Sequence, residues 1–148
     1  MSSAFLGLSD AVVTALNTPT ALAGGRIRRG RGVPVPTSHA TAIDVHVQRS
    51  TADTQYLSGS LLRWETLVGI DLYARAAAGT DGEAAIDTLL QDVFTRMAGA
   101  TPPSGVLGWV LEPAITWDVA EADVPIVQAS LALRVSHFTS TDLASAAV

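Results

Sequence analysis

The sequence contains no cysteine and no lysine, and each absence excludes a group of functions. Without cysteine the chain cannot form a disulfide, use a thiolate nucleophile or build a cysteine-based zinc finger. All nine basic residues are arginines. The chain therefore lacks the lysine of a phosphate-binding P-loop and the lysine that Schiff-base catalysis requires.

Charged residues are few, and acidic residues outnumber basic ones. This excess argues against broad nucleic-acid binding, which requires a basic surface. Charged residues make up 16% of the 148 residues, and the net charge is −5. Apolar residues make up 48% of the chain, yet no apolar run approaches the roughly 20 residues that span a bilayer. This composition favours a surface buried against partner subunits, or simply reflects the many alanines.

The clearest structural pattern is a strand followed by a helix. Residues 63–75 alternate between apolar and polar side chains over most of their length, which predicts a half-buried strand. Residues 80–99 are predicted to form an amphipathic helix, because apolar residues recur at three- and four-residue steps. Thr80 and Glu83 fit a capping box, and Gly99 ends the helix. The apolar stripe of the helix consists of Ile86, Leu89, Leu90, Val93, Phe94 and Met97.

Shorter patterns predict the other elements. A helix is expected over residues 3–17, a strand over 43–49, a polar hairpin loop over 50–59 and a last strand over 127–135. Between the long helix and the last strand, the apolar alternations of 107–111 and 115–119 are interrupted by Pro113, which indicates an edge strand or a bulge. Residues 139–148 are small and polar, and we expect a loosely held tail.

These elements predict a single α+β domain over residues 1–148. Its small, mostly antiparallel sheet would have about four strands, with two helices packed on one face. Residues 20–38, rich in arginine, glycine and proline, would form an extended arm or long loop, with a short edge strand as a further alternative. The other face of the sheet would carry Leu67, Tyr73, Val110 and one or two tryptophans, which favours an oligomer that covers them.

The arginine-rich segment is the one marked charge anomaly in the sequence. Four of the nine arginines, Arg26, Arg28, Arg29 and Arg31, lie between residues 24 and 32. Arginine forks bind carboxylates and phosphates, so the segment could contact a neighbouring subunit at the acidic residues Asp118, Glu121 and Asp123. Binding of single-stranded nucleic acid and a merely solvated loop remain alternatives. Gln55 and Tyr56, at the predicted hairpin tip, are further contact candidates.

Catalytic and metal-binding patterns are weak. His39, His46 and His137 could bind a metal if they converged with Asp44 or Asp71, but they show no short ligand spacing, and surface histidines are the favoured interpretation. Asp44, Glu65 and Asp71 could instead form an acidic cluster for Mg²⁺, although each is also an outward residue of an alternating strand. No Gly-x-Ser-x-Gly elbow supports a hydrolase. We therefore expect no enzyme activity, metal or cofactor.

The order of elements, the strand Trp64-Glu-Thr-Leu-Val-Gly-Ile-Asp-Leu-Tyr-Ala-Arg75 and the helix Asp87-Thr-Leu-Leu-Gln-Asp-Val-Phe-Thr-Arg-Met97 resemble the tail terminator proteins of long-tailed bacteriophages. The resemblance covers roughly residues 3–138 and rests on element order rather than on a catalytic motif. Related neck and head-completion proteins share much of this pattern.

The resemblance implies a structural virion protein located at the tail or neck and assembled in the host cytoplasm. Its partners would be other copies of itself in a hexameric ring, the tail tube protein and the head–tail connector or neck protein. Genomic DNA would pass through the ring without specific binding. The alternatives are another neck or head-completion ring protein, or a small nucleic-acid-binding or metal-dependent enzyme.

Overall fold

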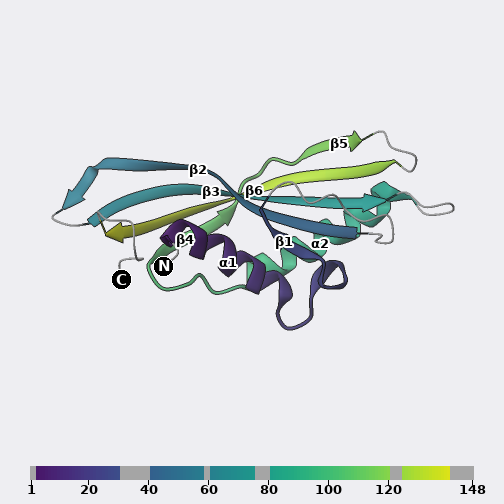
Figure 1. Ribbon diagram of the computed structural model, residues 1–148, viewed down its shortest axis with the longest axis horizontal. Coiled ribbons are helices and arrows are strands. Elements are labelled where there is room, and N and C mark those ends of the chain that lie inside the picture. The colour runs from purple at the N-terminus through teal and green to yellow at the C-terminus, as the bar shows by residue number, and fades with distance from the viewer. Residues whose placement is uncertain (1–2, 31–40, 59–60, 76–80, 121–124, 141–148) are drawn as a thin grey trace.

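The computed structural model describes residues 3–30, 41–58, 61–75, 81–120 and 125–140, and the side chains of 54–58 and 120 lie outside this description (Figure 1). The fold is α+β, with one mixed sheet and two α-helices. The elements in order are α1 (Ala4–Asn17), the short 3₁₀ helix η1 (Leu22–Gly25), β1 (Ile27–Arg29), β2 (Thr41–Ser58), β3 (Leu61–Arg75), α2 (Gly82–Gly99), β4 (Val106–Leu111), β5 (Thr116–Ala120) and β6 (Ile126–Ser140). None of the described helices is long and apolar enough to cross a membrane.

The sheet contains six strands in the order β1-β2-β3-β6-β4, and β5 also pairs with β6. β1 is parallel to β2, and the other pairs are antiparallel. The prediction of about four strands is therefore too low for two reasons. The region around Pro113 forms two separate strands, and part of the predicted arm forms the additional edge strand β1.

Both helices pack on one face of the sheet, as Figure 1 shows below β2 and β6. Buried apolar residues of both helices form one core cluster with alternate residues of β2, β3 and β6, because successive strand side chains point to opposite faces. α1 contributes Leu8, Val12 and Leu16, and α2 contributes Ile86, Leu89, Leu90, Val93 and Met97. Phe94, the remaining residue of the predicted stripe, is 38% exposed.

The start of α2 differs by one residue from the predicted capping box. The N-cap is Asp81, whose side chain accepts a hydrogen bond from the Glu83 backbone N–H at 3.0 Å. Thr80 itself lies outside the described residues. Aspartate caps a helix as well as threonine does and adds negative charge at the positive end of the dipole.

The three central strands are longer than the sequence predicts, and Figure 1 shows their ends extending beyond α1. The prediction of a hairpin loop over residues 50–59 is wrong for 50–58, which continue β2 and pair with the first half of β3. A register shift between Val47 and Arg49 admits the extra residue Gln48. The expected loose tail is also wrong at its start, because Thr139 lies in β6 and is fully buried.

A buried polar network explains why these strand ends are ordered despite their polar sequence. The Thr66 hydroxyl lies 2.8 Å from Ser50 Oγ and 2.8 Å from His137 Nε2. Trp64 Nε1 donates a hydrogen bond to Thr139 Oγ1 at 2.9 Å. Phe5 of α1 packs edge-on against the rings of Trp64 and His137. The start of α1 therefore packs on β3 and β6 beside this polar network.

Candidate assembly surfaces

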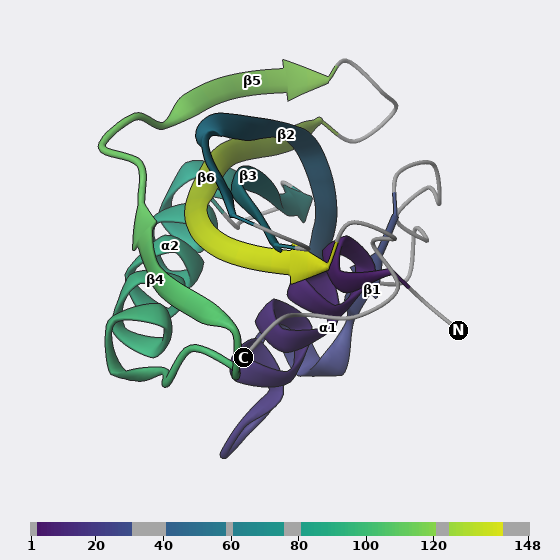
Figure 2. The same cartoon turned by 90° about the vertical axis from the view of Figure 1, so that its left-hand side faces the viewer.

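The sheet has two open sides with different chemistry. β1 lies at one end of the strand order, and β4 and β5 lie at the other, separated from β1 by β2, β3 and β6 (Figure 2). Edge strands present backbone N–H and C=O groups that can pair with another chain. We call the side formed by β1 the basic edge and the side formed by β4 and β5 the apolar edge.

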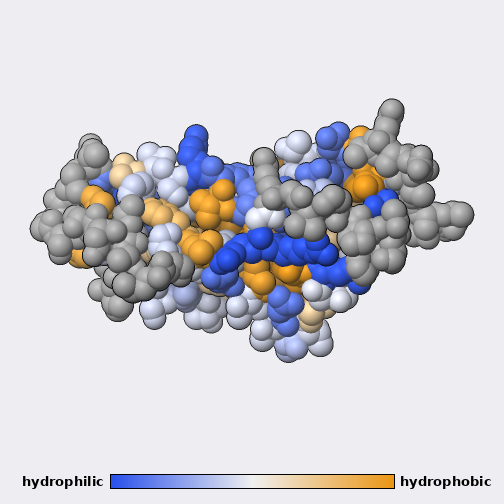
Figure 3. Space-filling model, viewed as in Figure 1, coloured by the Kyte–Doolittle hydropathy of each residue, from blue (hydrophilic) through white to orange (hydrophobic). Residues whose placement is uncertain are grey.

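The basic edge carries Arg26, Arg28 and Arg29, and it corrects the prediction of a long free arm. Residues 22–29 form η1 and β1 and are fixed to the domain. Arg26 Nε donates to the Thr41 carbonyl at 2.6 Å, and Arg29 pairs with Asp10 of α1 at 2.7 Å. Figure 3 shows a continuous hydrophilic band over the position of β1. The contacts of Arg26 and Arg29 therefore hold part of the basic edge in a defined position on the domain.

The two outer arginines of this band, Arg28 and Arg29, differ in availability. Arg29 forms an ion pair with Asp10, although the side chains of Arg29 and Asp10 remain 40% and 55% exposed. Arg28 pairs in register with Asp44 of β2, and its side chain is half-buried. An exposed ion pair is worth less than about 1 kcal/mol, so Arg29 can exchange its partner for an acidic group on another chain at little cost.

The apolar edge exposes large side chains that a monomer would normally cover. Val110 is 68% exposed and Leu107 57% exposed on β4, while Val119 is 53% and Trp117 48% exposed on β5. Trp117 and Val119 pair in register with the core residues Ala129 and Val127. They therefore continue the core face of the sheet beyond the part that the helices cover, which marks a contact surface.

Two grooves flank Trp109 next to this edge. One, of about 560 Å³, lies between the C-terminal halves of α1 and α2 and includes Pro19, Arg96 and Pro103 in its lining. The other, of about 520 Å³, lies between α2 and β4 and is lined mainly by apolar residues, including Phe94 and Val110. An apolar side chain of a partner could enter the second groove directly from the apolar edge.

The predicted contact residues lie in three places: at the two edges, on β2, and outside the residues that the structure describes. Arg26, Arg28 and Arg29 lie at the basic edge, and Asp118 is exposed on β5 between Trp117 and Val119. Arg31, Glu121 and Asp123 lie outside the described residues. The backbone of Gln55 and Tyr56 belongs to β2 rather than to a loop. In the strand order, β2, β3 and β6 separate β1 and its arginines from β5 and Asp118.

The histidine predictions need correction. His46 is 8% exposed and His137 1% exposed, so neither is the surface histidine that was the favoured interpretation. Burial lowers the pKa of His137 from 6.5 to about 4, which keeps its imidazole neutral. His39 lies outside the described residues. His137 continues the alternation of buried residues along β6, two residues after Val135, so this local pattern could have placed it on the core face.

The three predicted acidic residues do not form one cluster. Asp44 and Asp71 face each other across β2 and β3 beside His46. Glu65 lies elsewhere, 3.3 Å from Arg134 on β6, which also contacts Glu112 at 2.6 Å. The structure thus replaces the predicted all-carboxylate group by two aspartates and one histidine.

Comparison with known proteins gives a fold match and no sequence match. No protein-family model and no curated protein matches the chain. A solved structure described as the virion of a native gene transfer agent particle contains a chain that is 18% identical, with a TM-score of 0.66. The match covers 93% of this chain and 100% of that chain. The two chains therefore share one fold over the whole domain.

Proposed function

We propose that this protein is a structural virion component, a tail terminator whose ring caps the tail tube of a phage-like particle. The observation that carries the proposal is the full-length fold match to a chain of a gene transfer agent virion. The resemblance of the sequence to tail terminator proteins adds the specific role. The described residues supply an assembly surface at each side of the sheet, as a non-enzymatic ring subunit requires.

The two edges suggest how copies would associate. The basic edge of one subunit would meet the apolar edge of the next, so that Arg28 and Arg29 approach Asp118 while the partner covers Trp117 and Val119. Such head-to-tail contacts use a different patch on each subunit, and they form a ring when the rotations between copies add up to one full turn without a shift along the axis. The resemblance implies six copies.

Capping follows from the ring geometry. The ring would bury the growing end of the tail tube and present no equivalent surface to another tube subunit. Its opposite surface would receive the head–tail connector or neck protein, and genomic DNA would pass through the lumen without specific contacts. The projecting end of β2 and β3, which includes Gln55 and Tyr56, is the proposed tube contact because it extends beyond the packed domain (Figure 1).

The test is negative-stain microscopy of purified tail tubes with the wild-type protein and with the double variant Arg28→Glu/Arg29→Glu. The proposal expects single rings at tube ends and no further growth for the wild type, and loss of rings for the double variant. Arg49→Glu, an exposed substitution on β2 away from the basic edge, is the matched control. Rings that bind the connector but ignore tubes would favour the neck alternative, and monomers that ignore both would refute the assembly role.

A further inference from the structure

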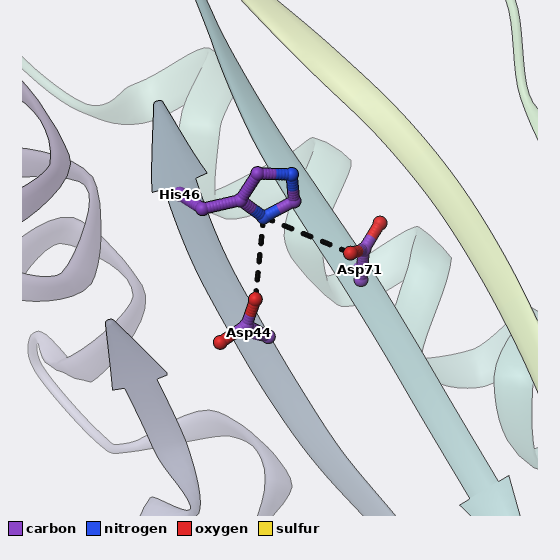
Figure 4. Close-up of side chains that lie close together, drawn as sticks. All are labelled: Asp44, His46 and Asp71. Atoms are coloured by element: carbon purple, nitrogen blue, oxygen red, sulfur yellow. Dashed lines mark hydrogen bonds and ion pairs between the residues drawn. The ribbon is translucent and has the colours of Figure 1, made fainter. Parts of the chain in front are cut away.

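Three potential metal ligands converge on the sheet face opposite the helices. Asp44 and His46 lie on β2, and Asp71 lies on β3, where it pairs in register with Asp44. Their ligand atoms all lie within 4.8 Å of one another. Figure 4 shows both carboxylates directed toward the same ring nitrogen, Nδ1 of His46.

His46 and Asp71 are buried and Asp44 is half-buried, and the Asp71 carboxylate lies beyond hydrogen-bond distance of the imidazole. The side chains of His46 and Asp71 are only 8% and 3% exposed. Asp71 Oδ2 lies 3.7 Å from His46 Nδ1, which is too long for a hydrogen bond, and none of the described residues donates one to this carboxylate. Buried carboxylates normally accept hydrogen bonds or coordinate a metal. Asp71 therefore has a carboxylate oxygen available to a ligand.

Hydrogen bonding by His46 accounts for only half of the arrangement. Its Nδ1–H can donate to Asp44 Oδ2, at 3.2 Å, but a single N–H cannot also satisfy Asp71. A small divalent ion would satisfy both. Bonds of about 2.0–2.2 Å to nitrogen and oxygen in tetrahedral geometry separate neighbouring ligand atoms by roughly 3.3–3.6 Å. The two separations from His46 Nδ1, 3.2 Å to Asp44 and 3.7 Å to Asp71, lie close to this range, and all three ligand atoms lie within 4.8 Å of one another.

We propose that Asp44, His46 and Asp71 form a structural site for a divalent transition-metal ion, with zinc as the best-fitting ion. One imidazole nitrogen and two carboxylate oxygens provide three ligands, and water can provide the fourth. The imidazole favours Zn²⁺ over Mg²⁺ and Ca²⁺, which prefer all-oxygen sites. A bound ion would link β2 to β3 and stabilise the sheet, whether or not the chain forms a ring.

The test is titration of chelator-treated full-length protein with Zn²⁺ and, separately, Mg²⁺ by calorimetry and thermal unfolding. The proposal expects about one Zn²⁺ per chain and a raised Tm, with no response to the same concentration of Mg²⁺. Asp71→Asn keeps the side-chain shape and should weaken Zn²⁺ binding at least tenfold. Asp92→Asn, at an exposed carboxylate on α2, is the matched control and should bind as the wild type does.

X-ray absorption of the zinc-loaded wild type keeps the test decisive if Asp71→Asn does not fold. The proposal expects one imidazole in the coordination shell and otherwise oxygen ligands. No zinc uptake, two or more imidazoles in the shell, or equal affinity of wild type and Asp71→Asn would overturn the site.

Discussion

His46 and Gly69 face each other across β2 and β3, and the missing side chain of Gly69 provides the space that the imidazole occupies. A Cβ atom at residue 69 would lie 2.6 Å from His46 Nε2, closer than van der Waals contact allows. Gly69→Ala is therefore expected to displace a buried ring and to destabilise the protein by about 1–3 kcal/mol. Urea unfolding monitored by tryptophan fluorescence measures this loss.

Gly7→Ala is the control for that substitution. Gly7 is exposed within α1, and no heavy atom lies within 4 Å of the position that its Cβ would take. Alanine at this site should stabilise the protein by about 1 kcal/mol through helix propensity. Equal effects of the two substitutions would mean that the approach of His46 to Gly69 is not a structural constraint.

Arg96 fastens the end of α1 to α2. Its Nη1 donates to the carbonyl oxygens of Thr18 at 2.6 Å and Thr20 at 2.7 Å, with a longer contact to Leu16 at 3.2 Å. Arg96→Met keeps much of the apolar stem but leaves these carbonyls without their donor. We expect a loss of about 1–3 kcal/mol in unfolding free energy. Arg49→Met is the control, and an equal, near-zero effect of both variants would contradict the assigned role.

His137 makes the stability depend on pH. Its pKa is about 4 in the folded protein, because of burial, against 6.5 in the unfolded chain. The unfolded chain therefore binds more protons between these values, so the contribution of His137 is complete above about pH 6.5 and is lost as the pH falls toward 4. The loss is at most about 3 kcal/mol. Urea unfolding of wild type and His137→Asn across this range should give converging curves, and parallel curves would refute the prediction.

The apolar edge should affect assembly more than folding. Leu107→Gln/Val110→Gln changes two exposed β4 side chains, so the stability of the subunit should change by less than about 1 kcal/mol. The partner subunit would bury both side chains in the assembly, so their loss should weaken association by at least about tenfold. Analytical ultracentrifugation measures this change. Leu6→Gln, on the exposed side of α1, should leave association unchanged, and an equal effect of both variants would remove the apolar edge as the contact.

The sequence predicts the elements whose side chains alternate regularly. Val68, Ile70 and Leu72 identify the core face of β3, and Leu89 and Val93 identify that of α2, because local periodicity reports burial on one face. The α+β class and the packing of both helices on one face follow from these patterns.

Pairing between strands that are distant in the sequence determines the features that local patterns do not predict. Residues 50–58 are polar, yet they extend β2 because the Ser50 hydroxyl bonds to that of Thr66 and residues 50–53 and Ser58 pair with β3. β1 is only three residues long and contains two arginines, so no periodicity distinguishes it from an arm. The convergence of His46 and Asp71 depends on the register of β2 against β3, which a single sequence does not determine.

The head-to-tail contact between the two edges is the central claim, and the absence of cysteine from the wild type allows a direct test. Arg28→Cys places a thiol at the basic edge, and Val119→Cys places one at the apolar edge. The two single variants are treated with a short bis-maleimide, separately and as a mixture, because this reagent does not require disulfide geometry. The account predicts cross-linked dimers in the mixture and few in either variant alone. Efficient cross-linking of either variant to itself, or none in the mixture at concentrations where the protein is oligomeric, would contradict it.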